Sequence, residues 1–318
     1  MPGRSVVILP GLGNNSSDYR QLAMTLRSRY GMHVETAPVS RLDWTRNAAG
    51  LLDGAYWSGS LCPRPTVDWY LQRVDLAVNK ARSACPDKPI TLLAHSAGGW
   101  LGRVFMLDYG TSALGIDRFV SLGSPHQPPP PGVVDQTRGI LTWVSNKCPG
   151  TFHEDVQYVT IAGRFIRGAS LLGPGNWQQR IVGAGYKQVC GEAEVWGDGI
   201  VPLPTAMLEG ALQLTLDRVY HSPLGAQQVV VAVDGENFSD KTANEMYKVS
   251  LFQTPSPDLS VDEGEIEDAS RTSSLSPADS FELKVTEGPR LWYGSDVVLE
   301  NWVSTLTDSK SLASVDAL

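Results

Sequence analysis

Three residues of this 318-residue chain, Ser96, Asp198 and His221, have types and an order that could do chemistry together. Each lies in a short stretch that contains glycine or proline. A serine becomes a nucleophile when a histidine removes its proton and an aspartate orients that histidine. The surrounding elements must therefore bring these three side chains to one edge of the fold.

The residues around Ser96 predict a sharp strand-to-helix turn. The apolar run at 90–93 leads into Ala94-His95-Ser96-Ala97-Gly98-Gly99, and a helix-compatible segment follows at 100–109. At the tip of such a turn the backbone is strained, small neighbours permit close approach, and the side chain is pushed into the open. The helix N-terminus behind it favours negative charge on a substrate. This pattern predicts Ser96 as the nucleophile, although an ordinary strand-to-helix turn can look the same.

Asp198 and His221 supply the predicted partners of this serine. Asp198 lies between two glycines and directly before Ile-Val-Pro at 200–202, so a tight turn can point its carboxylate sideways. His221 follows a predicted strand at 212–216, in the sequence Val-Tyr-His-Ser-Pro. Alone, they would be a turn aspartate and a surface histidine. In the order serine, aspartate, histidine, each at the carboxyl end of a strand, they predict a catalytic triad.

The loop at 10–15 is a candidate oxyanion-hole element. The apolar strand predicted at 5–9 ends in Pro-Gly-Leu-Gly-Asn-Asn, and glycines let backbone N–H groups face a developing negative oxygen. We expect the amides of Leu12 and Ala97 to hold that oxygen. A plain glycine turn is the alternative. A phosphate-binding loop is disfavoured because no Lys-Ser/Thr follows.

Apolar periodicity predicts an α/β fold around these loops. Strands are expected at 5–9, 33–37, 90–93, 118–122, 156–162 and 212–216, and helices at 18–30, 66–84, 100–109 and 295–306. Asp18 is expected to cap the first helix. The aromatic stretch 41–65 and the excursions 127–155 and 163–196 are candidates for a wide apolar mouth, with 132–155 as lid or rim. Core packing of the aromatic residues explains that stretch equally well.

His126, in the sequence Gly-Ser-Pro-His after the strand at 118–122, is a possible second catalytic histidine. A histidine at that place more often holds the loop at the strand end, and this structural role is the one we expect. The remaining histidines form no H-x-H or H-E-x-x-H pair, so no metal site and no cofactor are expected.

Composition excludes several classes of protein. The net charge is −8 with no basic stripe, which argues against a nucleic-acid partner. The sequence has no apolar run of about 18 residues, so no transmembrane helix is predicted. The short run at 5–9 is expected to be a strand rather than a targeting peptide. The four cysteines, Cys62, Cys85, Cys148 and Cys190, are far apart in the chain and favour reduced thiols in an intracellular protein. A disulfide between Cys62 and Cys148 stays open.

The acidity of the chain is concentrated in one segment. Residues 234–289 hold 13 acidic and 4 basic residues. The centre of this segment, 254–280, is rich in Ser, Pro, Asp and Glu and cannot offset its ordering entropy by burial. We therefore expect a disordered insertion at 234–289 within a catalytic α/β domain made of 1–233 and 290–318.

Ala-His-Ser-x-Gly-Gly at 94–99, Gly-Asp-Gly-Ile-Val-Pro at 197–202 and His221 resemble the lipase and esterase branch of the α/β-hydrolase superfamily. More narrowly, residues 9–15, 56–70 and 219–223 are similar to plant and algal hydrolase-like proteins often sent to plastids. The resemblance covers about residues 5–224 and 291–303. The resemblance implies a mostly parallel central sheet flanked by helices. It leaves a plastid location open, although no targeting peptide is recognised.

The expected function is hydrolysis of a carboxylic ester, an acyl lipid or other apolar ester, through an acyl-enzyme, with peripheral membrane contact open. A thioesterase or acyltransferase would use the same triad. A hydrolase-fold protein that binds a ligand with little turnover is an alternative of another class. In a third interpretation the acidic segment docks a basic partner and the hydrolase body is its scaffold.

Overall fold

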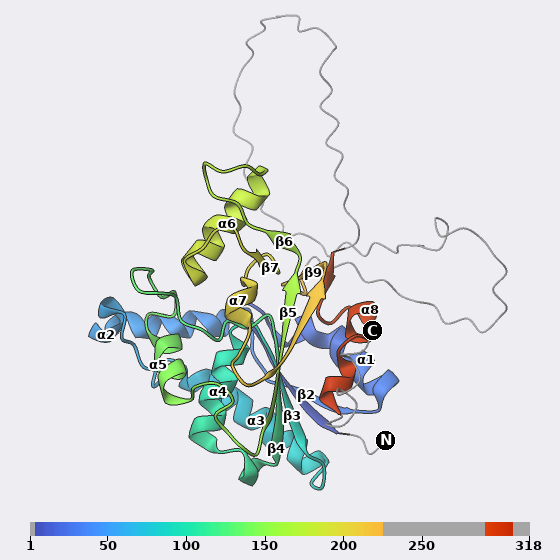
Figure 1. Ribbon diagram of the computed structural model, residues 1–318. Coiled ribbons are helices and arrows are strands. Elements are labelled where there is room, and N and C mark those ends of the chain that lie inside the picture. Colours follow the sequence, from blue (N-terminus) through green and yellow to red (C-terminus); the bar gives the residue numbers. More distant parts are fainter. Residues whose placement is uncertain (1–3, 225–289, 308–318) are drawn as a thin grey trace, which may run out of the picture. The chain divides into compact units, whose positions relative to one another are not determined.

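A six-stranded sheet in the order β2-β1-β3-β4-β5-β8 forms the centre of the computed structural model, and every neighbouring pair of strands in it is parallel. The structure describes residues 4–224 and 290–307. The six strands are β1 (Ser5–Leu9), β2 (His33–Thr36), β3 (Ile90–His95), β4 (Ile116–Leu122), β5 (Gln157–Arg164) and β8 (Leu212–Asp217). The predicted α/β fold class, a mostly parallel central sheet flanked by helices, is confirmed (Figure 1).

Helices cover both faces of this sheet. The α-helices are α1 (Arg20–Tyr30), α2 (Gly54–Ser58), α3 (Asp68–Ala84), α4 (Gly98–Tyr109), α5 (Ile140–Lys147), α6 (Trp177–Cys190), α7 (Leu203–Ala206) and α8 (Asp296–Leu299). Four 3-10 helices, η1 (Ser16–Tyr19), η2 (Arg41–Leu52), η3 (Ser112–Leu114) and η4 (Val303–Leu306), are interspersed. Short strands form two further pairs: antiparallel β6 (Ile166–Arg167) with β7 (Trp196–Gly197), and parallel β9 (Val219–Tyr220) with β10 (Leu291–Trp292).

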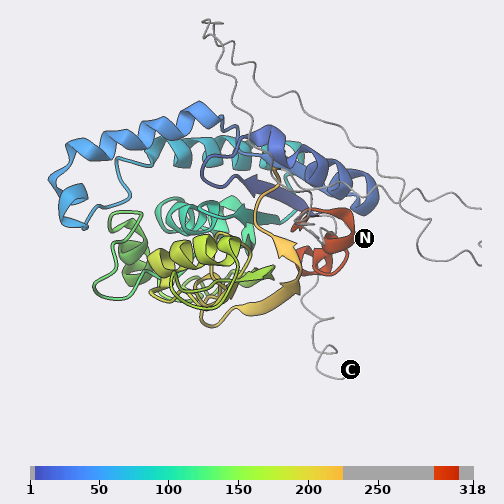
Figure 2. The same cartoon turned by 90° about the horizontal axis from the view of Figure 1, so that it is seen from above.

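Alternation along the strands divides the core into two layers. Val6 and Ile8 of β1 pack with α1 and the C-terminal segment, whereas Val7 and Leu9 pack with α3, α4 and α5. A strand buried on both faces shows no polar alternation, which is why β1 and β3 appear as continuous apolar runs. Figure 1 and Figure 2 both show α1 and α8 side by side, and Thr25 donates to Asp296 between them.

Two predicted helices differ in detail from the structure. The first begins at η1, where Asn15 is the N-cap and Asp18 returns the bond as the third residue of a capping box, so Asp18 is not itself the N-cap. The helix expected at 295–306 splits into α8 and η4. Between them the Asn301 side chain bonds the Val297 carbonyl and competes with the helical pattern.

The segment 132–155 contains a core element as well as loops. Helix α5 buries Ile140, Leu141 and Val144 in the layer beneath α4. These residues have the i, i+1, i+4 spacing of one helix face, so they anchor this part of the excursion to the body.

Contacts divide the chain into two units, 1–232 with 290–318, and 233–289. The acidic segment 234–289 lies outside the described residues, so its predicted disorder and the proposed domain boundaries stay predictions. Within residues 4–224 and 290–307, no helix has the length and apolarity needed to cross a membrane. The four cysteines, all in that part of the chain, are free thiols, and only Cys148 is buried.

Candidate active site

Ser96 occupies the sharp turn between β3 and α4. Its φ of 52° lies in the left-handed region, an uncommon conformation for a residue other than glycine. The turn needs small residues behind it: a Cβ on Gly98 would lie 2.5 Å from the Leu9 carbonyl oxygen, and one on Gly99 would lie 2.3 Å from the Ser124 Cβ. This close packing imposes the strained conformation on Ser96, which lies partly exposed at the tip of the turn, at the N-terminal end of α4.

Two glycines let the chain fold tightly around Asp198. A Cβ on Gly197 would lie 2.4 Å from the Val201 carbonyl oxygen, and Gly199 has a φ of 101°. The Asp198 amide donates to that same carbonyl at 3.2 Å. His221 directly follows β9, and its amide donates to the Asp198 carbonyl oxygen at 2.9 Å. The two predicted partners are therefore joined by their backbones before their side chains meet.

The structure brings the side chains of Ser96, His221 and Asp198 into one hydrogen-bonded chain. His221 Nδ1 lies 2.7 Å from Asp198 Oδ2, and His221 Nε2 lies 3.0 Å from Ser96 Oγ. An ionised carboxylate only accepts, so Nδ1 carries the proton and the Nε2 lone pair faces the serine hydroxyl. In this tautomer the histidine can take the serine proton.

The Asp198 carboxylate is almost fully buried, with 1% of its side chain exposed. Burying an ionised carboxylate is costly unless hydrogen bonds replace water. Oδ1 accepts the amides of Ile200 at 3.1 Å and Val201 at 2.7 Å. Oδ2 accepts the His221 ring and also the Tyr293 hydroxyl, at 2.8 Å. Four hydrogen-bond donors thus replace water around the buried carboxylate.

His95, the residue before the serine, is fully buried beside His221. Its Nε2 lies 2.9 Å from the His221 carbonyl oxygen and its Nδ1 lies 2.7 Å from the Tyr19 hydroxyl. The rings of His95 and His221 are 4.8 Å apart. Burial, reinforced by the neighbouring His221 charge, lowers the pKa of His95 to about 3. His95 is therefore neutral at physiological pH.

The candidate oxyanion loop is a tight turn over residues 11–14. The Asn14 amide donates to the Gly11 carbonyl oxygen at 3.1 Å, and Gly13 supplies a φ of 76°. Gly11 lies against the nucleophile, because a Cβ there would be 2.7 Å from the Ser96 Cβ. Among the residues that the structure describes, the amides of Leu12 and Ala97 have no acceptor. Two free N–H donors are thus available on the elements predicted to supply them.

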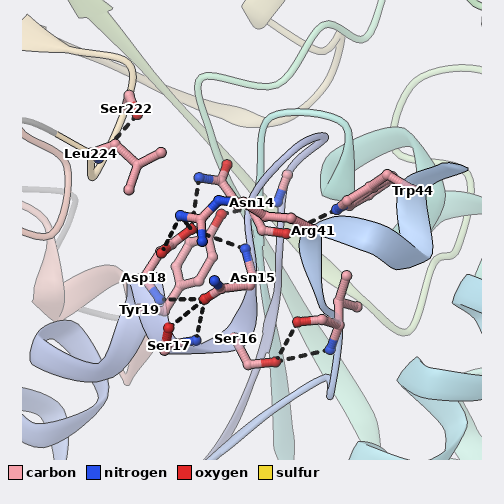
Figure 3. A network of polar contacts seen from close by, with 12 residues as sticks. Asn14, Asn15, Ser16, Ser17, Asp18, Tyr19, Arg41, Trp44, Ser222 and Leu224 are labelled. Atoms are coloured by element: carbon pink, nitrogen blue, oxygen red, sulfur yellow. Dashed lines mark hydrogen bonds and ion pairs between the residues drawn. The ribbon is translucent and has the colours of Figure 1, made fainter. Parts of the chain in front are cut away.

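Side chains from several elements fix this turn, as Figure 3 shows. The Trp44 indole N–H donates to the Asn14 carbonyl at 2.8 Å. Asp18 accepts the Asn15 amide at 2.9 Å and the Asn14 side chain at 3.2 Å, and Arg41 pairs with both of its oxygens. Hydrogen bonds and an ion pair therefore hold the loop in one conformation before any substrate arrives.

His126 is buried away from this chain of hydrogen bonds. Its Nε2 lies 2.8 Å from the Ser121 hydroxyl and its amide donates to the Thr205 carbonyl oxygen at 2.7 Å. Burial lowers its pKa well below the usual value. None of its hydrogen bonds within the described part of the chain reaches Ser96, Asp198 or His221, which supports the structural role expected for it.

The aromatic stretch before residue 66 has two kinds of members. Trp44 is only 8% exposed and packs edge-on against Trp69, whereas Trp57 is 71% exposed. Three further apolar residues are exposed close to the site groups in the chain. They are Leu12 of the turn, Ile200 two residues after Asp198 and Leu224 three residues after His221, with 62%, 53% and 47% exposed. The loops that carry Leu12, Asp198 and His221 therefore each present an exposed aliphatic side chain.

Sequence reasoning missed three residues of this arrangement: Tyr19, His95 and Tyr293. His95 stands directly before the serine and Tyr293 follows an apolar pair, but a single tyrosine or histidine has no spacing that reveals its partner. Their contacts join positions 76, 126 and 95 residues apart in the chain. No group of residues able to hold a metal ion occurs within 4–224 and 290–307.

No protein-family model matches the chain, and no curated protein does. Several solved structures resemble it. The lipase BlEst2 of Bacillus licheniformis is 15% identical, with 70% of this chain and 86% of that chain covered and a TM-score of 0.45. The metagenomic carboxyl esterase MGS0156 is 14% identical, with 69% and 64% covered and a TM-score of 0.40. Phospholipase PlaB of Legionella pneumophila is 12% identical, with 69% and 54% covered and a TM-score of 0.45.

Proposed function

We propose that the protein is a serine hydrolase that cleaves carboxylic esters through an acyl-enzyme. The observation that carries this proposal is the chain from Ser96 Oγ to His221 Nε2 at 3.0 Å and from His221 Nδ1 to Asp198 Oδ2 at 2.7 Å. It ends at a serine in a left-handed conformation at a strand-to-helix turn. A base in the correct tautomer beside a strained serine is what nucleophilic acyl transfer requires.

In the acylation step, Ser96 Oγ attacks the ester carbonyl while His221 Nε2 takes the serine proton. The imidazolium then gives that proton to the leaving alcohol, and Asp198 stabilises the positive ring without being protonated. Water, activated by the same histidine, attacks the acyl-enzyme and releases the acid. The amides of Leu12 and Ala97 hold the oxyanion in both steps. No cofactor enters the reaction.

An apolar acyl group fits the surroundings of the serine. Leu12, Ile200 and Leu224 are exposed on the three loops that carry the oxyanion donor, the acid and the base. Aliphatic side chains in such places gain free energy when a ligand covers them. An acyl lipid or another apolar ester is therefore the proposed substrate class. The resemblance to plastid-type hydrolases stays a prediction about location.

Reaction with a fluorophosphonate probe tests the nucleophile. The wild-type protein should label on one serine, Ser96→Ala should not label, and its ester turnover should fall by about 10³-fold or more. Ser222→Ala is the matched control, because that hydroxyl caps only the Leu224 amide beside the proposed base, and it should label normally. Labelling that survives in Ser96→Ala would refute the assignment.

A panel of p-nitrophenyl esters of increasing chain length then tests the substrate class. We expect kcat/KM to rise with acyl length, because burying each added methylene group gains about 0.8 kcal/mol of binding free energy. A profile that falls with length would contradict an apolar acyl site. Faster product formation with an added alcohol would identify an acyltransferase, and a folded protein that neither labels nor turns over would identify a ligand-binding protein.

A further inference from the structure

A buried chain of hydrogen bonds links the candidate oxyanion turn to the candidate base. The Gly11 amide lies 2.9 Å from the Tyr19 hydroxyl, that hydroxyl lies 2.7 Å from His95 Nδ1, and His95 Nε2 lies 2.9 Å from the His221 carbonyl oxygen. Both Tyr19 and His95 are fully buried. Neither residue touches the reacting atoms, and the proposed mechanism uses neither.

The direction of every bond in this chain follows from its two ends. A carbonyl oxygen only accepts, so His95 Nε2 carries a proton and donates to His221. A neutral imidazole has one N–H, so His95 Nδ1 accepts, and the Tyr19 hydroxyl is its donor. The Tyr19 oxygen then accepts the Gly11 amide. This one tautomer of His95 therefore gives a partner to both of its own ring nitrogens, to the Tyr19 hydroxyl proton and to the His221 carbonyl oxygen.

Burial makes this arrangement a strict one. Because its pKa is lowered to about 3, His95 stays neutral. The His221 imidazolium that forms in the reaction therefore meets no second positive ring at the distance of 4.8 Å that separates the two histidines. Besides His221, the rings of Tyr19, Trp292 and Tyr293 surround it. None of these neighbours carries a charge at neutral pH, since burial raises the pKa of both tyrosines.

We propose that Tyr19 and His95 are positioning residues that hold the oxyanion turn and the base in a fixed relation to the serine between them. This inference rests on the proposed function. The Tyr19 hydroxyl fixes the amide next to Leu12, and His95 fixes the backbone of His221. A displacement of about 1 Å in such groups costs about 10²-fold in rate, so their loss should appear in kcat rather than in KM.

Substitutions at His95 can separate the two halves of the link. A glutamine places an amide nitrogen near the position of Nε2, and an asparagine places its amide near the position of Nδ1. His95→Gln should keep the bond to the His221 carbonyl and lose Tyr19, while His95→Asn should do the reverse. Tyr19→Phe should leave the Gly11 amide and His95 Nδ1 without a partner. We expect kcat to fall about 10-fold to 10²-fold in each, with KM within about 3-fold.

The rates are measured per active serine, counted by titration with the fluorophosphonate, and well below each variant's Tm. A purely structural role would lower Tm and leave kcat per titrated site unchanged, which would overturn the proposal. Tyr30→Phe is the matched control, because this tyrosine of the α1 terminus has no hydrogen bond from its hydroxyl among the described residues. It should keep the wild-type kcat.

Nitrogen NMR of ¹⁵N-histidine-labelled protein tests the link even if no ester is hydrolysed. We expect His95 as the neutral Nε2–H tautomer at every pH from about 5 to 9, and a changed Nδ1 shift in Tyr19→Phe. A Nδ1–H tautomer, or titration of His95 near its ordinary pKa, would refute the positioning role. Absence of both turnover and labelling together with the expected tautomer would refute only the proposed function.

Discussion

The Asp198 carboxylate depends on a residue from the far end of the chain. Tyr293 lies just after β10, donates to Asp198 Oδ2 at 2.8 Å and accepts the Gly163 amide at 2.7 Å. The same carboxylate oxygen accepts the His221 ring. Because two donors share one oxygen, the tyrosine withdraws charge that would otherwise be directed at the histidine.

Tyr293→Phe should lower kcat/KM. Without the hydroxyl, Asp198 Oδ2 keeps only the His221 ring as a donor, so the buried carboxylate is less fully hydrogen-bonded and orients the histidine less strictly. We expect a loss of about 10-fold at neutral pH, against about 10⁴-fold for Asp198→Asn, in which the histidine tautomer itself is no longer fixed. The measurement is kcat/KM at neutral pH.

Tyr186→Phe is the matched control for this prediction. Its hydroxyl accepts the Gly199 amide at 2.9 Å but does not bond the carboxylate. It should lower stability and keep kcat/KM near the wild-type value. Equal losses of kcat/KM in the two variants would indicate a general disturbance of the Asp198 turn and would contradict a direct effect of Tyr293 on the carboxylate.

At the scale of elements, the turn at 11–14 is held from several directions. The Tyr70 hydroxyl of α3 donates to the Pro10 carbonyl oxygen at 2.7 Å, and the Trp44 indole of η2 donates to that of Asn14. Tyr19 closes η1 beneath the same loop. Preorganised donors lower a barrier because they need not be rearranged during the reaction.

Gly11→Ala should mainly lower activity, whereas Gly13→Ala should mainly lower stability. A Cβ on Gly11 meets Ser96 and His95 at 2.7 and 3.0 Å, so alanine must push the turn away from the nucleophile. We expect kcat to fall by about 10²-fold, as when an oxyanion donor is lost. Gly13 faces open space at a φ of 76°, so alanine there costs about 1 kcal/mol of strain.

The two variants are compared by kcat per titrated serine and by urea denaturation. Gly11→Ala should lose more activity, while Gly13→Ala should lose stability with most of its activity kept. If both variants keep the wild-type kcat, the turn does not supply the oxyanion donor.

At the scale of the whole molecule, buried histidines couple stability to pH. Burial lowers the pKa of His95 to about 3 and that of His126 well below the usual value. In the unfolded chain both titrate near 6.5. At pH values between the folded-state and the unfolded-state pKa, the unfolded state binds protons that the folded state does not bind. The free energy of unfolding therefore falls as the pH falls below about 6.5.

Each of these histidines should contribute a slope of about 1.4 kcal/mol per pH unit in that window and none above it. Urea denaturation at several pH values between about 4.5 and 7.5 measures the slope. His126→Gln keeps an amide near Ser121 but cannot titrate, so its slope should be smaller by about that amount. An unchanged slope in His126→Gln would show that His126 is protonated in the folded protein.

The local sequence determined the elements and three of the site groups. Apolar runs fixed β1 and β3 because both faces of a central parallel strand are buried. Small residues around Ser96 and Asp198 indicated the two turns because backbones approach closely there. The order of Ser96, Asp198 and His221 then predicted their meeting, because serine, acid and histidine follow one another in this chain order in one known class of catalytic triad.

Only the tertiary structure decided how that site is held. Tyr19, His95 and Tyr293 have no local pattern, because a hydrogen bond between residues 76 to 126 positions apart depends on how layers pack. The C-terminal segment shows this most clearly: β10 pairs with β9, directly before His221, and thereby brings Tyr293 to Asp198. Spacing along the chain can propose a serine, an acid and a base, whereas packing selects the side chains that fix them.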